Sequence, residues 1–433
     1  MKRRGCFSRL VFCALCVFFA CAVCAGSVIY VDAAAINDPG PNNPNISDTN
    51  ENGSLEHPFD AIQKAINVVG EGGTIIVMPG SYPDSNPDSY SETDFKNKNF
   101  TLSSIDPNDW DIVKSTIING TVYFGGNEGP DCRLMGFKIH NVNYGAIYGE
   151  NTHATISNCI ISGNAPCGAT VLMDFDGLLE NCLITDNNTA AFCGTYPVIW
   201  GCNGIIRNCT IANNISGIAV DSAVIENTII YNNQGVQLSI VSDNVAEISY
   251  SNIEGGLDGI AGYGDVVWGL GNISVEPRFV RLGYWDMQNI RLYEGDYHLK
   301  SFGWRINEED QSNWVFDLVT SRCIDAGNPA YDLKNEIMLA PNDPESDYAV
   351  NIRINMGAYG GTGHASLGPY DWSLLADLNN DGVVDFEDIL LMAQDWLSQD
   401  LKMPGDISRD GLVNMEDYSL LGEIWQKITD WAQ

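Results

Sequence analysis

A short segment that recurs through the middle of the chain constrains the fold more than any other feature. Five runs share an apolar, β-favouring core, and each closes on Asn or Gly: GFKIHN, CIISGN, CLITDN, CTIANN and TIIYNN. Their matching isoleucines recur at uneven but similar intervals: Ile139, Ile161, Ile184, Ile211 and Ile230. Self-similarity at such a period indicates a solenoid, in which each repeat packs only on its neighbours.

The residue types of the repeat select the kind of solenoid. The runs lack the Leu-x-x-Leu-x-Leu frame of leucine-rich repeats, and they are too short for apolar residues at helical spacing. Short β-runs with Asn and Gly turns predict a parallel β-helix, in which like residues stack about 4.8 Å apart on successive coils. We expect isoleucines to stack in the core over roughly ten coils. At the turns we expect a ladder of Asn158, Asn181, Asn208 and Asn227.

Three cysteines, Cys159, Cys182 and Cys209, occupy one column of the repeat. Stacked cysteines have parallel Cα–Cβ bonds, which suit disulfide geometry poorly, so we predict buried free thiols. The alternative is a disulfide that involves loop cysteines such as Cys193 and Cys202. The even count of eight cysteines beyond residue 25 keeps that alternative open.

The segment 1–25 has the pattern of a secretory signal peptide. A basic start precedes an apolar run from Leu10 to Val23, and small residues follow. An uncleaved anchor is the alternative; after cleavage we expect no stable membrane insertion. Removal of residues 1–25 leaves 18 Lys and Arg against 56 Asp and Glu, a net charge of −38. Such a charge argues against nucleic-acid partners and suits cation binding. The signal peptide predicts a secreted or cell-surface location.

The segment HPFDAIQKAINVV, residues 57–69, is predicted to be an N-terminal capping helix. A solenoid needs a cover because its terminal coil otherwise exposes core and unpaired strand. The residues on the predicted apolar face are Phe59, Ile62, Ala65, Ile66 and Val69.

Two acidic loops, DLNNDGVVDFED at 377–388 and DISRDGLVNMED at 406–417, follow the repeats. Each loop has oxygen-bearing side chains at positions 1, 3, 5, 9 and 12, Gly at position 6 and an apolar residue at position 7, which can offer only its carbonyl. This is the register of an EF-hand calcium loop, with Asp in place of Glu at position 12. The predicted ligands of two Ca²⁺ ions are Asp377, Asn379, Asp381, Val383, Asp385 and Asp388, and then Asp406, Ser408, Asp410, Leu412, Asn414 and Asp417.

A helical run follows each loop, and the spacing from Asp377 to Asp406 equals that from Trp396 to Trp425. We therefore predict a small α-helical domain of paired EF-hand-like halves, with calcium as a folding ligand because the carboxylates otherwise repel one another. The apolar face of the first helix is predicted to contain Phe386, Ile389, Leu390, Ala393 and Leu397.

Several sequence segments outside the repeats resemble those of a known family, among them HPFDAIQKAI, GGTIIVMPGSY, GNISVEPRFV, SRCIDAGNPA and INMGAYGGT. They resemble secreted right-handed β-helix proteins of the pectate-lyase-like superfamily, in particular those of planctomycete-type bacteria. The paired loops resemble a type I dockerin, a module that binds cohesins. The expected organisation is mainly β: a signal peptide at 1–25, a right-handed parallel β-helix solenoid at 28–365, a linker at 366–371 and a dockerin-like calcium-binding domain at 372–430.

This resemblance implies binding or processing of extracellular polysaccharide. It leaves open an enzyme, either a calcium-dependent lyase of acidic glycans or another carbohydrate-active enzyme, and a non-catalytic surface adhesin or structural protein. For a lyase, the candidate catalytic residues are Asp174, Asp176 and Arg207; the alternative is that these acids line a solvated loop. Phe386-Glu387 and Met415-Glu416 occupy positions at which dockerins often carry Ser-Thr. Both a cohesin-like module and a cell-surface component therefore stay open as partners.

Overall fold

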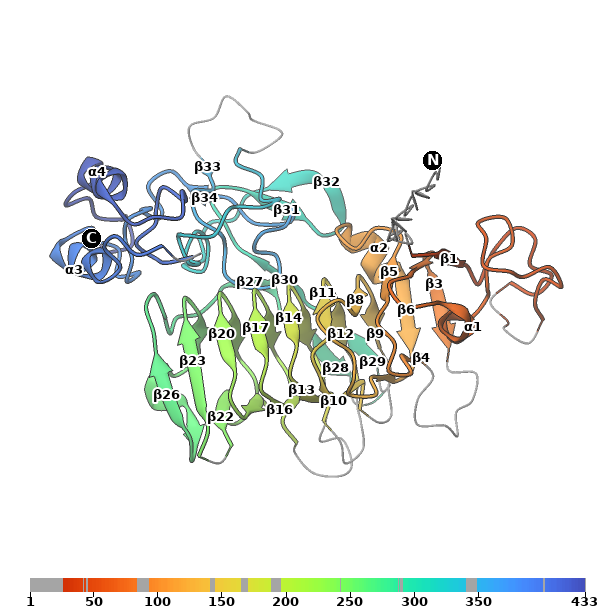
Figure 1. Ribbon diagram of the computed structural model, residues 1–433. Coiled ribbons are helices and arrows are strands. Elements are labelled where there is room, and N and C mark those ends of the chain that lie inside the picture. The colour runs from red at the N-terminus through yellow and green to blue at the C-terminus, as the bar shows by residue number, and fades with distance from the viewer. Residues whose placement is uncertain are drawn as a thin grey trace, which may run out of the picture.

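The computed structural model describes residues 26–432 except 42, 44–45, 84–92, 141–144, 165–169, 188–195, 242, 287, 289–290, 340–348 and 400–401. The predicted signal peptide therefore lies outside the described residues. Most of the described chain winds into a parallel β-solenoid, and a small helical domain lies beside its last coils (Figure 1).

Three sheets, here called A, B and C, form the walls of the solenoid. Sheet A contains β1 (Val28–Val31), β2 (Thr74–Val77), β5 (Thr101–Ser104), β8 (Arg133–Met135), β11 (Thr155–Ser157), β14 (Leu178–Glu180), β17 (Ile205–Arg207), β20 (Val224–Glu226), β23 (Val245–Ser249) and β26 (Asp265–Trp268). Sheet B contains β3 (Gly80–Pro83), β6 (Thr116–Asn119), β9 (Lys138–Ile139), β12 (Ile160–Ser162), β15 (Leu183–Thr185), β18 (Thr210–Ala212), β21 (Ile229–Tyr231) and β24 (Asn252–Ile253). Sheet C contains β4 (Thr93–Asp94), β7 (Val122–Tyr123), β10 (Ile147–Thr152), β13 (Leu172–Phe175), β16 (Ile199–Cys202), β19 (Ile218–Val220), β22 (Leu238–Ile240) and β25 (Ala261–Gly262). Each coil from β2 to β25 contributes one strand to each sheet in the order A, B, C, whereas β1 and β26 add strands to sheet A alone.

The predicted isoleucine ladder is confirmed. On sheet B, Ile139, Ile161, Ile184, Ile211 and Ile230 pair in register from coil to coil, and all five are fully buried. Each such side chain stabilises the fold by about 1.5–3 kcal/mol through burial. The estimate of roughly ten coils is somewhat high: among the described residues eight coils have a strand in every sheet, and only sheet A has ten strands.

The predicted asparagine ladder is also confirmed, and it marks the turn from sheet A to sheet B. Asn158, Asn181, Asn208 and Asn227 all have φ near +50°, the left-handed conformation that Asn tolerates better than most residues. The segment INMGAYGGT lies over this turn. Asn181 donates from Nδ2 to the carbonyls of Ala358 (3.0 Å) and Gly360 (2.6 Å).

A second, buried ladder follows sheet B at the Asn that closes each repeat. The Nδ2 group of Asn187 donates to Oδ1 of Asn214 (3.0 Å), and that of Asn214 donates to Oδ1 of Asn233 (2.8 Å). Each amide also donates to a carbonyl of the preceding coil, as Asn187 does to Ile161 (2.9 Å). An amide both donates and accepts, so identical side chains satisfy one another along the stack.

The stacked cysteines are free thiols, as predicted. Cys159, Cys182 and Cys209 are buried and unbridged, and burial is the main cause that raises the pKa of Cys182 well above its ordinary value. The alternative of a Cys193–Cys202 disulfide is wrong for Cys202, which is a buried free thiol whose pKa burial raises to about 12. Cys193 lies outside the described residues.

The N-terminal helix is confirmed as α1 (Ile62–Val68), which buries Ile62, Ala65 and Ile66 against the first coils. A second helix, α2 (Trp110–Ser115), precedes β6, and the 3₁₀ helix η1 (Leu257–Gly259) precedes β25. Beyond the solenoid, four antiparallel pairs line its flank: β27 (Phe279–Arg281) with β30 (Asp296–Leu299), β28 (Tyr284–Asp286) with β29 (Arg291–Tyr293), β31 (Arg305–Asn307) with β32 (Asp310–Val315), and β33 (Ala349–Val350) with β34 (Gly368–Pro369).

The C-terminal domain contains α3 (Phe386–Gln394) and α4 (Met415–Glu423), each directly after an acidic loop. The predicted apolar face of α3 is wrong in large part: Phe386, Leu390 and Leu397 are 76%, 64% and 65% exposed, and Ala393 is also exposed. Met392 is buried instead, and Ile389 packs beside it. Both sides of this helix are apolar, so periodicity alone did not reveal which side meets the core.

Candidate functional site

The two acidic loops have nearly the same internal geometry. The first Asp of each, Asp377 or Asp406, accepts hydrogen bonds from the amides at positions 5 and 6 at 2.8–3.1 Å. The glycines at position 6, Gly382 and Gly411, have φ of +92° and +87°, which a residue with a side chain rarely adopts. Two separate stretches of the chain thus form the same bend.

Each loop also ends in the same way. The residue at position 9, Asp385 or Asn414, is the N-cap of the following helix. The residue at position 12, Asp388 or Asp417, accepts a hydrogen bond from the backbone amide of that cap at 2.8 Å. These capping boxes tie the loop to its helix, so the geometry of the loop and the position of the helix depend on each other.

The acids at positions 1 and 12 are buried, whereas the predicted ligands at positions 3, 5, 7 and 9 lie at the rim. Burial is the main cause that raises the pKa of Asp377 to about 7, and the charges of Asp388 and Asp381 raise it further. Burial likewise raises the pKa of Asp388 to about 6. A divalent cation held by hard oxygen donors would neutralise such a pair, so the donor set fits calcium.

The structure places the predicted ligands of each loop in one turn of the chain, but it does not gather their acidic side chains into a metal-binding cluster. Among the described residues, no three His, Cys, Asp or Glu side chains lie close enough together to hold a metal ion on their own. The loop acids bond backbone amides instead, and Asn379 donates to Asp381 at 3.0 Å. The EF-hand register also uses Asn, Ser and carbonyl oxygens, which such a cluster of acids does not include.

The candidate catalytic residues on the solenoid lie on different sheets. Asp174 is on β13 of sheet C and Asp176 follows it, whereas Arg207 ends β17 of sheet A. Burial, followed by the charges of neighbouring acids, raises the pKa of Asp174. Arg207 donates from Nε to Glu180 at 3.1 Å and from Nη1 to the Tyr331 hydroxyl at 3.3 Å. The structure therefore does not bring this guanidinium to the two aspartates.

The outer face of sheet C presents a column that sequence reasoning missed. Tyr123, Tyr148, Met173 and Trp200 pair in register on four successive coils. The residue before each of them is fully buried, so this column faces outward, and Trp200 is 43% exposed. The ring centres of Tyr123 and Tyr148 lie 6.5 Å apart. Alternation of buried and outward residues across each short strand was the signal that could have found this column.

A groove of about 690 Å³ lies between α2 and the hairpins β28–β29 and β31–β32. The rings of Tyr284 and Tyr293 stack there at 4.7 Å, and Lys114 pairs with Glu308 at 2.7 Å. Acidic and basic side chains are mixed along its walls, and several already pair with one another. The groove therefore shows no uniform charge that would select one class of ligand.

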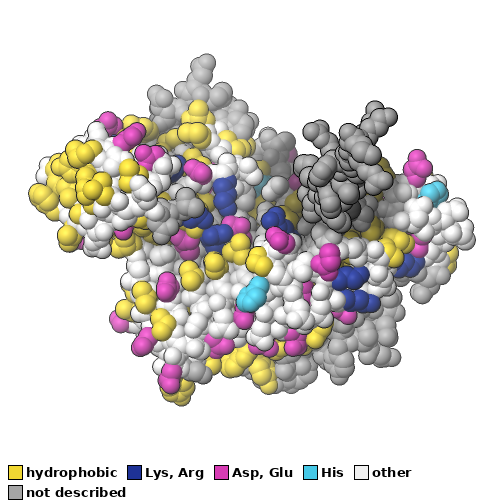
Figure 2. Space-filling model, viewed as in Figure 1, with side chains coloured by type: hydrophobic (Ala, Val, Ile, Leu, Met, Phe, Trp, Pro, Cys, Tyr) yellow, Lys and Arg dark blue, Asp and Glu magenta, His cyan; other side chains and the backbone are white. Residues whose placement is uncertain are grey.

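Hydrophobic side chains gather on the outer face of the C-terminal domain, which forms the lobe at the left of Figure 2. The exposed residues on and beside the two helices include Phe386, Leu390, Met415 and Tyr418. Phe386 and Met415 occupy equivalent positions in the two halves, because each is the first residue of its helix. An apolar patch on a helical face is typical of a protein-docking surface.

The three sheets and the paired loops define a parallel β-solenoid followed by an EF-hand-like pair. Residues 104–223 match the family model of the right-handed β-helix region, and residues 375–423 match that of the dockerin type I domain. The chain thus contains a right-handed β-helix region and a dockerin type I domain.

Among solved structures, the chain is similar to a crystal structure of pectate lyase Pel9A at 14% identity, with a TM-score of 0.28 and coverage of 77% of this chain and 96% of that one. A search of curated proteins finds no match. In the described part of the chain, no helix has both the length and the apolar character needed to cross a bilayer.

Proposed function

We propose that this chain is an extracellular, non-catalytic polysaccharide-binding protein that joins a larger assembly through its C-terminal domain. The observation that carries the proposal is the outward column of Tyr123, Tyr148, Met173 and Trp200 on sheet C. The coil repeat of about 4.8 Å spreads these four side chains over roughly 14 Å. Aromatic rings offer a flat apolar face with a polar edge, which suits the C–H faces and hydroxyls of sugar rings.

In this proposal the C-terminal domain holds two calcium ions, each through five oxygen-bearing side chains and the position-7 carbonyl of its loop. Calcium would supply the positive charge that lets the buried acids of positions 1 and 12 coexist. The exposed helical face with Phe386 and Met415 would then bind a cohesin-like module or a cell-surface component. The proposed boundaries are a signal peptide at 1–25, the β-helix at 28–365 and the calcium-binding domain at 372–430.

The proposed linker at residues 366–371 is packed along half of its length. Ser366 and Leu367 are buried, and Ser366 donates from its hydroxyl to the Leu299 carbonyl at 2.7 Å. Gly368 and Pro369 then form β34, which pairs with β33. This segment therefore connects the two parts without a long exposed tether.

Affinity electrophoresis of the full-length chain against neutral and acidic polysaccharides tests the proposed binding surface. We expect retardation by at least one polysaccharide and an affinity at least tenfold weaker for Trp200→Ala. Tyr263→Ala is the matched control, because Tyr263 is 89% exposed and lies outside the column. Retardation of Trp200→Ala equal to the wild type would refute the surface. Release of unsaturated products that absorb in the ultraviolet would show instead that the chain is a lyase.

A further inference from the structure

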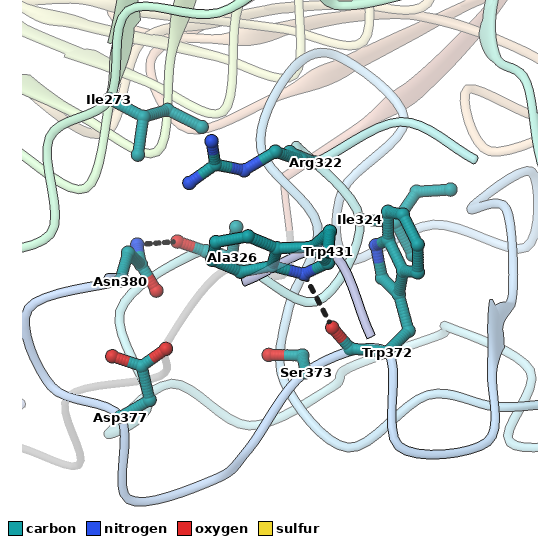
Figure 3. A pocket seen from close by; sticks show the side chains of 9 residues that line it. All are labelled: Ile273, Arg322, Ile324, Ala326, Trp372, Ser373, Asp377, Asn380 and Trp431. Atoms are coloured by element: carbon teal, nitrogen blue, oxygen red, sulfur yellow. Dashed lines mark hydrogen bonds between the residues drawn. The ribbon is translucent and has the colours of Figure 1, made fainter. Parts of the chain in front are cut away.

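The residue at position 4 of each calcium loop points out of the loop and into the β-helix part of the chain. Asn380 and Arg409 occupy this position in the first and second loop, with φ of +61° and +63°. Asn380 donates from Nδ2 to the carbonyl of Ala326 (Figure 3) and to that of Gly271, both at 2.8 Å. The predicted ligands on either side, at positions 3 and 5, stay at the loop rim. Position 4 is thus the anchor of the loop and not a predicted ligand.

The second loop repeats this arrangement on a neighbouring segment. Arg409 donates from Nε to the carbonyl of Pro329 and from Nη2 to that of Ile352, each at 2.9 Å. Both acceptors belong to the part of the chain that covers the last coils of the solenoid. The same position of both halves therefore makes the same kind of contact, a side-chain donor to backbone carbonyls outside the domain.

A residue of the solenoid's A-to-B turn also contacts the first loop. Tyr250 takes the place of Asn227 on the next coil, has the same left-handed conformation (φ +46°) and is fully buried. Its hydroxyl donates to the Leu378 carbonyl at 2.9 Å. Arg353, also fully buried, lies 5.8 Å from the Tyr250 ring centre and donates to the Asp377 carbonyl at 2.7 Å. The backbone at positions 1 and 2 is thus held from the solenoid side.

Trp372 and Trp431 line a narrow crevice at the junction, the contact between the C-terminal domain and the β-helix part of the chain (Figure 3). Trp431 donates from Nε1 to the Trp372 carbonyl at 2.8 Å, and the Arg322 guanidinium lies 3.8 Å from its ring centre. Trp372 in turn donates to the Ser321 carbonyl at 3.0 Å. The crevice is lined by residues of both parts of the chain, including Ile273 and Asp377.

We propose that calcium binding by the two loops fastens the C-terminal domain to the last coils of the β-helix. This inference rests on the proposed calcium sites. The conformation of positions 1, 2 and 4 decides both where the ligand oxygens lie and whether Asn380, Arg409, Leu378 and Asp377 meet their partners. Two events that need one conformation are thermodynamically linked, so calcium stabilises the junction and the junction raises calcium affinity by the same factor. The domain is a calcium-controlled clamp on the solenoid.

The test uses the full-length chain with calcium and with a chelator. Calcium uptake is measured by titration calorimetry, and hydrogen exchange is measured for peptides from residues 245–275 and 320–331, with 155–212 as an internal reference. We expect chelation to raise exchange about tenfold or more in the first two regions and to leave the reference unchanged. If calcium binds and exchange at 245–275 does not change, the clamp is refuted while the calcium sites stand. If no calcium binds, both the clamp and the proposed calcium sites are refuted.

Three variants separate the anchors from the ligands. Asn380→Gly and Arg409→Gly keep the left-handed backbone and delete only the anchoring side chain, and Tyr250→Phe deletes only the hydroxyl. We expect each to weaken calcium affinity by about threefold to tenfold and to raise exchange at 245–275 in the presence of calcium. Ser419→Ala, at an exposed position of α4 outside both loops, is the matched control and should change neither. Wild-type calcium affinity in all three anchor variants would overturn the linkage.

Discussion

The β-helix and the C-terminal domain both repeat a polar side chain at a fixed place in each unit, yet the two repeats differ in what they need. The buried asparagines of the solenoid donate and accept, so Asn187 satisfies Asn164 on one side and Asn214 on the other. The buried aspartates of the loops only accept when ionised, so Asp377 and Asp388 cannot satisfy each other. A repeat of amides is self-sufficient, whereas a repeat of carboxylates needs a cation from outside.

The largest expected effect is on the C-terminal domain when the first acid of each loop is removed. Asp377→Ala combined with Asp406→Ala should abolish calcium uptake and the helical signal of α3 and α4. At calcium a thousandfold above Kd, each lost site removes about 4 kcal/mol of stabilisation. Far-UV circular dichroism with and without chelator measures this. Asp371→Asn, which neutralises an exposed acid outside the loops and tolerates its left-handed φ of +56°, is the control and should keep both signals. Unchanged helicity in the double variant would contradict the claim that the C-terminal domain, unlike the solenoid, needs a cation to fold.

The next effect concerns the neutral ladder. Asn187→Ala removes the Oδ1 that accepts from Asn164 and the Nδ2 that donates to the Ile161 carbonyl, both of them buried. We expect a loss of about 3 kcal/mol in the free energy of unfolding, measured by denaturant titration, and no dependence of that loss on calcium. Asn203→Ala, an exposed turn asparagine, should cost less than about 0.5 kcal/mol. A loss at Asn187 that vanished on chelation would contradict a self-sufficient ladder.

A smaller effect depends on pH and concerns Asp325 at the junction. Burial raises its pKa to about 7, and its Oδ1 accepts from the amides of Ile352 and Arg353. Because the folded-state pKa lies above the ordinary value, the proton stabilises the fold below about pH 4, and that contribution is lost as pH rises towards 7. Asp325→Asn should gain roughly 2 kcal/mol over the wild type at pH 8 and little at pH 4. Denaturant midpoints at saturating calcium measure the difference. Equal midpoints at both pH values would argue that the carboxylate is already neutralised.

The smallest effect on stability is expected at the outer face of α3. Phe386→Ala should change the free energy of unfolding by less than about 0.5 kcal/mol, because this ring is 76% exposed. Met392→Ala, on the buried side of the same helix, should cost about 2–5 kcal/mol. Thermal unfolding with calcium compares the two variants. A large cost at Phe386 would indicate that this face is part of the fold and not a docking surface.

Much of the solenoid could be predicted because each coil repeats the same local problem. Ile161, Asn181 and Cys182 each recur at the coil period, so one good alignment predicts a whole column. The column of Tyr123, Tyr148, Met173 and Trp200 escaped because its strands are short and its members differ in type. The EF-hand register of the two acidic loops could be recognised for a related reason, since a single uninterrupted stretch contains the complete pattern, and the ligand roles stay a prediction.

The amino-acid sequence by itself determined the coil period, the asparagine turns, the capping helix and the candidate ligand positions of both loops, because each depends on neighbours along the chain or on strict repetition. Only the tertiary structure decided which side of α3 is buried, that Arg207 pairs with Glu180, and that Tyr250 and Asn380 join the two parts. Those contacts join segments that are far apart in the chain, and no sequence repeat indicates them. Their energy arises from complementary packing, which no local sequence pattern encodes.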